Sequence, residues 1–421
     1  MTNLFMDNYK YWLLPIIILS PSFQIFIGYP FLRVEYIFLF FFIILSLLKF
    51  AYIKKIKKSN FDYVGLLFLL MAISCITSIE YSIMFLGYNF KINDFFLIIQ
   101  LFLYYLIFYI AKTLYIKEGK FFKIYKFLAI SGILVALFCI LQYFNVLEIN
   151  RKILVPLYFY NKPLEQTKAF NLVQGVHWRR IIGTFGNPNY CGMFFAILLA
   201  ATSSYYLFPI KGKLKLHYFF IIEIGIIALM MLTGSRTAMF SFVIITLFSV
   251  FSGKLKIKKL KYFFIIIIGV IFILVFATPQ YFIGRIFSEY TSFHAHLSMF
   301  KEAFKEINKS PILGLGPTKM QLTSTVDNEY LLYLRRYGLI GIILFLLLHI
   351  CIFIKGFSKF SKGKTTIENN IGFLTVQLAI IWAIYGLTSD AFKNPQMMGI
   401  IFFLTGLSWA KFPRKDIEIK K

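Results

Sequence analysis

Long apolar runs separated by short polar breaks are the feature that most constrains what this chain can fold into. A helix needs about 20 consecutive apolar residues to cross a bilayer, and about twelve such segments can be marked along the sequence. The runs lie near residues 11–29, 31–48, 61–79, 94–115, 124–147, 190–208, 217–233, 235–251, 261–277, 327–354, 369–390 and 395–411. They predict an all-α polytopic membrane protein with about 12 transmembrane helices, forming a single integral membrane domain over residues 1–421.

The composition excludes the main non-membrane classes of protein. Of the residues, 59% are hydrophobic and 15% are charged, whereas a soluble domain has about 25% charged residues. A soluble enzyme, a disordered chain and a fibrous protein are therefore excluded. The first apolar run lacks a cationic start and a small-residue cleavage site, so we expect it to remain as a helix. The 4 cysteines show no CxxC or Cys/His spacing, which indicates neither a disulfide framework nor a zinc site.

Basic residues between the runs predict the orientation of the chain. With the N-terminus inside, the Lys-rich breaks all fall on the cytoplasmic side, as positively charged loops do in membrane proteins. These breaks are 49–60, 112–126, 211–215, 254–261 and 355–364, with 411–421 at the end. Both termini are thus expected in the cytoplasm. The net charge of +27 is mostly a topology signal, and no nucleic-acid partner is expected.

Arginine has the opposite distribution. In this topology all but Arg414 lie on the outer side, which the positive-inside rule disfavours. Arginine presents a planar, bidentate fork that fits phosphate. The outer arginines therefore indicate an anion-binding function, although any single one could instead reach the lipid headgroups.

Two outer loops are long enough to carry further structure, at 148–189 and 278–326. In the second loop, Leu297, Phe300, Phe304 and Ile307 recur at helical spacing, with charged residues between them. This pattern predicts an amphipathic helix that lies on the membrane surface or caps a cavity. Ser310-Pro311 ends the helix and GLGP at 314–317 forms a turn.

Two outer segments combine an arginine with a tight turn. Arg180 precedes the GTFGNPN sequence at 183–189, whose backbone N–H groups can line an anionic pocket; alternatively, Asn187 simply caps a helix. Arg236 lies in the TGSRTA segment at 233–238, which joins two runs with almost no loop. An arginine at that depth should face a water-filled cavity and meet an anion, the alternative being a salt bridge that caps a helix.

A third segment combines a carboxylate with a cation. Asp327, Asn328 and Glu329 lead into Arg335, and Asp327 and Arg335 share one helical face about two turns apart. Asp327 could serve as a general base, or it could be the N-cap of the helix.

Together these segments resemble the bacterial O-antigen ligase/polymerase superfamily of membrane glycosyltransferases, over roughly residues 180–345. The sequence matches the family pattern with Arg180 and GTFGNPN, Thr233 to Ala238, Pro311, Gly314, Gly316, Asp327-Asn328, Gly338 and Gly341. Ligases carry a catalytic His where this chain has Asp327, and many members carry an Arg where it has His296, four residues before Phe300. These departures favour the polymerase branch, often called Wzy.

The resemblance implies an enzyme that joins sugar chains carried on undecaprenyl pyrophosphate at the outer face of the inner membrane. Its product would be O-antigen or capsular polysaccharide, made without a nucleotide sugar. No cofactor is expected, and because no cluster of Asp and Glu on the outer side looks like a divalent-metal site, no metal is expected either. The expected pyrophosphate-binding residues are Arg180, Arg236 and Arg285, the last on position alone. The expected base is Asp327, with possible support from Asn187, Asn328, Glu329, Arg335 and His296. The partners implied are the lipid-linked donor and acceptor, the bilayer and a chain-length regulator protein.

Two other functions stay open. The protein could be a ligase that passes the glycan to another acceptor, such as lipid A-core, a protein or a cell-wall polymer. Twelve spans also suit a transporter of lipid-linked oligosaccharide, but such proteins usually show two related halves. No similarity between the halves is visible in this sequence.

Overall fold

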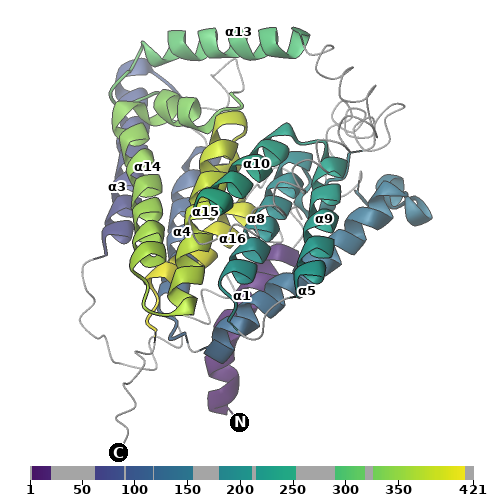
Figure 1. The fold of residues 1–421 in the computed structure, drawn as a ribbon. Coiled ribbons are helices and arrows are strands. Elements are labelled where there is room, and N and C mark those ends of the chain that lie inside the picture. Colours follow the sequence, from purple (N-terminus) through teal and green to yellow (C-terminus); the bar gives the residue numbers. More distant parts are fainter. Residues whose placement is uncertain are drawn as a thin grey trace, which may run out of the picture.

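The chain forms a helical bundle with one helix laid across its end (Figure 1). The computed structural model describes residues 2–19, 62–89, 92–116, 118–154, 180–210, 215–252, 290–317 and 326–412. Within these residues the structure is all-helical, and only an isolated bridge between Tyr115 and Lys411 has β geometry. The predicted all-α class is therefore confirmed, whereas the runs near 31–48 and 261–277 lie outside the described residues.

The apolar runs that the structure describes all form helices. The longer ones are α3 (Tyr63–Leu86), α5 (Glu118–Tyr143), α8 (Pro188–Leu207), α14 (Glu329–Lys362) and α15 (Thr366–Thr388). These 5 helices are long and apolar enough to cross a membrane. The others are α1 (Thr2–Leu19), α4 (Phe96–Lys112), α9 (Leu216–Thr233), α10 (Arg236–Phe251) and α16 (Pro395–Gly406). The chain is thus a multi-pass membrane protein.

Helices α8, α15 and α16 form the centre of the bundle, and every residue of α16 is buried. In the most apolar stretches of α8 and α15, 72% and 78% of the residues are buried, against 39% and 33% in the peripheral helices α3 and α5. Gln377 of α15 donates hydrogen bonds to Ser203 of α8 at 3.2 Å and to Ser249 of α10 at 3.0 Å. Polar side chains that bond between helices stabilise association where no hydrophobic effect acts between apolar helices.

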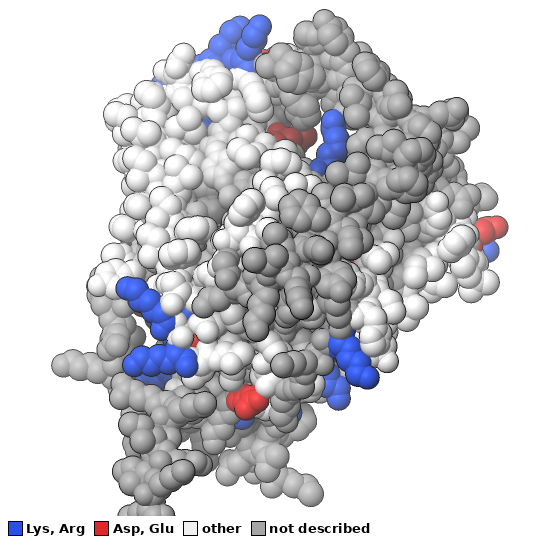
Figure 2. Space-filling model, in the orientation of Figure 1, with Lys and Arg blue, Asp and Glu red and all other residues white. Residues whose placement is uncertain are grey.

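Predicted outer and cytoplasmic segments lie at opposite ends of the bundle. At one end, the backbone N–H of Ile116 donates to the carbonyl of Lys411 at 3.0 Å, and Lys359 lies over the ring of Phe412. Helix α13 (Tyr290–Ile307) lies across the other end, at the top of Figure 1. In Figure 2 most of the visible charged side chains lie toward the two ends. This arrangement fits the topology expected from the basic loops.

Helix α14 is interrupted at Gly338, and the backbone there contacts the loop that follows α13. Gly338 has φ 61° and ψ −162°, a conformation that essentially only glycine adopts. A Cβ there would lie 2.1 Å from the carbonyl oxygen of Ile312, and one at Gly314 would lie 2.3 Å from that of Arg336. The backbone N–H of Gly316 donates to the Arg336 carbonyl at 2.8 Å. The two glycine motifs therefore form one contact, here called the glycine clasp, between residues 311–316 and 335–340.

Helix α13 confirms the amphipathic helix predicted in the second outer loop, with one difference in its buried face. Ala303 and Ile307 are buried and Phe300 packs beside them, whereas Phe304 is 54% exposed. Periodicity placed Phe304 on the apolar face, but Ala303 is the residue buried there, in one cluster with Leu331 of α14. An ion pair of 3.1 Å between Arg335 and Glu306 fastens α13 to α14.

Candidate functional site

The turn that carries Arg180 is fastened to α5 by one buried side chain. The Oε1 atom of Gln142 accepts hydrogen bonds from the backbone N–H groups of Ile182 at 3.0 Å and Gly183 at 3.1 Å. The side chain of Asn187 accepts from the backbone N–H of Asn189 at 2.8 Å. Asn187 is thus the N-cap of α8, as the capping alternative predicted, and is not among the residues that line the pocket described below.

Arg180 is oriented by the end of α9 and the beginning of α8. Its Nε atom donates to the carbonyl of Thr233 at 2.8 Å, and its Nη2 atom donates to Oδ1 of Asn189 at 3.4 Å. The backbone N–H of Ile181 also donates to the carbonyl of Leu232 at 3.2 Å. These bonds place the guanidinium beside the turn that carries Arg236.

That second turn positions Arg236 as the first residue of α10. Gly234 has φ 58° and ends α9, and the Ser235 side chain caps α10 by accepting from the Ala238 N–H. A Cβ at Gly192 of α8 would lie 2.8 Å from that of Ala238, so only glycine permits this approach. A helix N-terminus carries a partial positive charge, to which Arg236 adds a full one. The side chain of Ser235 caps the helix, and a salt bridge of Arg236 stays the alternative prediction.

Arg180, Arg236 and Asp327 line one pocket of about 540 Å³. Its lining residues are Arg180, Asn189, Gly234, Arg236, Thr237, Phe240, Phe300, Asp327, Ile384, Leu387 and Thr388. Figure 2 shows basic and acidic side chains beside a hollow near the end of the bundle where α13 lies. The structure thus brings together three residues that are distant in the sequence and that were each predicted to act in the site.

Asp327 is held at the pocket by its neighbour Asn328. The Asn328 side chain caps α14 by accepting from the Leu331 N–H at 2.9 Å, and it donates to the carbonyl of Leu387 at 3.1 Å. The alternative that Asp327 is the cap is therefore wrong. Asp327 is exposed, so its carboxylate is accessible from the pocket that it lines. Across the same rim, the hydroxyls of Thr237 and Thr388 lie 2.6 Å apart and join α10 to α15.

The other supporting residues lie elsewhere. Glu329 is 1% exposed, and its carboxylate accepts from the Phe392 N–H at 2.6 Å and from Trp382 Nε1 at 3.3 Å. Arg335 forms the ion pair with Glu306. Neither lines the pocket. Arg285 and the side chain of His296 lie outside the described residues; the helix that carries His296 contributes Phe300 to the pocket.

Sequence reasoning missed several lining residues. Asn189 and Thr237 lie inside recognised motifs, so their positions were a usable signal. Phe240, Leu387 and Thr388 carried no signal, because they lie in ordinary apolar helices and reach the pocket only through packing. Within the described residues no group of three or more His, Cys, Asp or Glu side chains could hold a metal ion.

Residues 221–346 match a protein-family model described as O-antigen ligase. The matched part contains Arg236, Phe300 and Asp327, whereas Arg180 precedes it. No curated protein is significantly similar to the chain in sequence. The match does not separate polymerases from ligases. It confirms the resemblance seen in the motifs: residues 221–346 are similar to the O-antigen ligase family and so support the O-antigen ligase/polymerase superfamily.

Proposed function

We propose that this protein is a glycosyltransferase that polymerises oligosaccharide repeat units carried on undecaprenyl pyrophosphate. The observation that carries the proposal is the pocket itself. Arg180 and Arg236 lie on its α8–α10 side and Asp327 on its α14–α15 side. In the proposed topology about 12 helices span the cytoplasmic membrane with both termini inside, and the pocket faces the outside.

The arginines suit the leaving group of the donor. As the bond between the anomeric carbon and the pyrophosphate oxygen breaks, negative charge grows on that oxygen. Fixed guanidinium groups and the N-terminus of α10 stabilise such a charge in place of a metal ion. Arg180 is pre-oriented by its bonds to Thr233 and Asn189, so little reorganisation is needed. We include Arg285 as a third pyrophosphate-binding residue.

Asp327 suits the acceptor. A hydroxyl of the acceptor sugar forms the new bond to the anomeric carbon and transfers its proton to the Asp327 carboxylate. Undecaprenyl pyrophosphate leaves with the electrons of the broken bond. The rings of Phe240 and Phe300, which also line the pocket, offer flat apolar faces for the C–H face of a sugar. His296 precedes Phe300 by about one helical turn, and Arg335 supports the site by holding α13 in place.

The sequence favours a polymerase over the two alternatives. Asp327 occupies the position where ligases of the superfamily carry His, and a polymerase accepts a second lipid-linked unit. Transport of the lipid-linked glycan has no specific observation in its favour. A chain-length regulator remains an expected partner.

Arg236 provides the first test. In vesicles that contain the purified protein and lipid-linked repeat units, we expect a polymer ladder from the wild type and none from Arg236→Ala at equal protein level. Lys301→Ala is the matched control, because Lys301 is an exposed cation of α13 that does not line the pocket. A normal ladder from Arg236→Ala would remove the arginine from the mechanism.

A deletion strain separates polymerase from ligase. Loss of a polymerase leaves single repeat units attached to the final acceptor, because ligation continues. Loss of a ligase leaves no glycan on the acceptor, while long lipid-linked polymer accumulates. The first pattern is expected here, and the second would overturn the polymerase assignment while keeping the transferase chemistry.

A further inference from the structure

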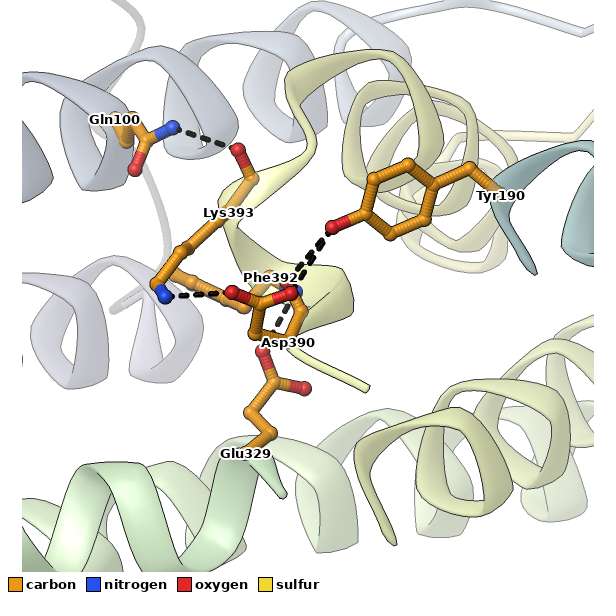
Figure 3. Close-up of polar contacts among 6 residues, drawn as sticks. All are labelled: Gln100, Tyr190, Glu329, Asp390, Phe392 and Lys393. Atoms are coloured by element: carbon orange, nitrogen blue, oxygen red, sulfur yellow. Dashed lines mark hydrogen bonds and ion pairs between the residues drawn. The ribbon is translucent and has the colours of Figure 1, made fainter. Parts of the chain in front are cut away.

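A cluster of hydrogen-bonded side chains fastens the short helix η5 (Ala391–Lys393), which follows α15 (Figure 3). Asp390 accepts from the hydroxyl of Tyr190 of α8 at 3.1 Å and pairs with Lys393 at 2.5 Å. Gln100 of α4 donates to the carbonyl of Lys393 at 3.1 Å. Glu329 of α14 accepts from the backbone N–H of Phe392 at 2.6 Å. Helices α4, α8 and α14 are therefore all joined to one short segment.

The members of this cluster are neighbours in sequence of residues that line the pocket. Three separate segments show the same relation: Tyr190 follows Asn189, Glu329 follows Asp327 by two residues, and Asp390 follows Thr388 by two. A movement of the cluster would therefore displace three pocket-lining segments together.

Glu329 is the member with the closest link to the proposed base. Its two carboxylate oxygens are both occupied, one by the Phe392 N–H and the other by Trp382 Nε1. Trp382 is fully buried, and its ring stacks on Phe392 at 5.9 Å between centroids. Because Glu329 is 1% exposed, its carboxylate cannot reach an acceptor hydroxyl in the pocket. It can, however, fix where α14 begins.

We propose that Glu329 is a positioning residue, which locks the start of α14 to η5 and thereby holds Asp327 opposite the two arginines. Asn328 attaches the start of α14 a second time, to Leu387 of α15. Because this bond stays when Glu329 is replaced, Glu329 controls where the start of α14 lies and not whether it folds. This inference rests on the proposed function, because it assigns Glu329 an effect on the group that takes the proton.

Three variants separate positioning from proton transfer. Glu329→Gln keeps an oxygen for the 2.6 Å bond from Phe392 and loses only the longer bond from Trp382. Glu329→Ala removes both acceptors and leaves two buried N–H donors unpaired. Trp382→Phe is the matched control, since it removes the longer bond and keeps a smaller aromatic ring beside Phe392. A displacement of about 1 Å at a reacting group can lower a rate by about 100-fold.

The kinetic experiment measures release of undecaprenyl pyrophosphate, a product that polymerases and ligases share. For Glu329→Ala we expect kcat to fall by about 100-fold, with KM for the lipid-linked unit close to that of the wild type. Glu329→Gln and Trp382→Phe should keep most of the wild-type kcat. If Glu329→Gln is as inactive as Glu329→Ala, the carboxylate itself is required and the positioning role is overturned. Wild-type kcat in Glu329→Ala overturns it too.

A spectroscopic arm makes the test independent of activity. A nitroxide is attached through Asp327→Cys in a protein that lacks the native cysteines, and its mobility is read from the electron paramagnetic resonance line shape. We expect greater mobility when Glu329→Ala is added and no change when Glu329→Gln is added. Equal mobility in all three proteins would overturn the positioning role. If the wild-type protein releases no undecaprenyl pyrophosphate, the proposed function is contradicted instead. The nitroxide mobility would still decide the role of Glu329.

Discussion

Replacing Gly338 with alanine tests the glycine clasp, which joins the loop after α13 to the interruption in α14. The backbone at Gly338 has φ 61° and ψ −162°, and a residue other than glycine in such a region costs about 1–3 kcal/mol. The new Cβ would also lie 2.1 Å from the Ile312 carbonyl oxygen. Because this contact is with backbone, no side-chain rotation relieves it and the clasp must open.

Opening the clasp breaks a defined set of hydrogen bonds. Three of them are short: Leu339 N to Pro311 O at 2.8 Å, Leu315 N to Arg335 O at 3.0 Å and Gly316 N to Arg336 O at 2.8 Å. Each contributes about 0.5–1.5 kcal/mol, so their loss adds about 1.5–4.5 kcal/mol. With the conformational cost, Gly338→Ala should lower the free energy of unfolding by roughly 2.5–7.5 kcal/mol.

The assay compares thermal unfolding in detergent and polymer formation in vesicles. Gly225→Ala is the matched control, because no atom lies within 4 Å of a Cβ at that position in α9. We expect Gly338→Ala to unfold at a clearly lower temperature and to make little polymer, since the same segment carries Asp327 and holds α13. The control should behave as the wild type does. If Gly338→Ala keeps the wild-type unfolding temperature, the clasp does not constrain α14 and the reasoning is refuted.

Three further predictions concern the site and its supports. Asp327→Asn should keep the fold and lower the polymerisation rate by about 10²–10⁴-fold. Asp327→His should keep partial activity, because imidazole is a base near neutral pH. An unchanged polymerisation rate in Asp327→Asn would show that Asp327 is not the base. Gln142→Leu leaves the backbone N–H groups of Ile182 and Gly183 without their acceptor. The free energy of unfolding, measured in detergent, should fall by about 1–3 kcal/mol for each of these two groups. For Asp390, burial raises the pKa of the carboxyl, but Lys393 and Tyr190 outweigh burial and hold the pKa below its ordinary value. The Asp390–Lys393 pair therefore stabilises the fold above pH about 4, and this stabilisation is lost as the pH falls through the lowered pKa. The free energy of unfolding of Asp390→Asn should accordingly depend less on pH in the acid range than that of the wild type.

Local pattern alone predicted much of this protein. Apolar run length identified the described helices other than α13, because a bilayer demands about 20 residues per span and leaves no water for unpaired backbone groups. Glycine, proline and asparagine marked the turns at Arg180 and Arg236, because those residues stop helices wherever they occur. The three residues now found in one pocket were candidates on residue type, on place and on the motifs that resemble the superfamily.

Only the tertiary structure decided which neighbours these residues meet. Asp327 and Glu329 are two acidic residues separated by one position, yet one is exposed at the pocket and the other is buried against η5. Arg335 shares a helical face with Asp327 but pairs with Glu306 of α13. Helical spacing tells which side chains share a face, but not which distant segment packs against that face. Leu387 and Thr388 enter the pocket for the same reason, since contacts between residues far apart in sequence are set by how the helices pack.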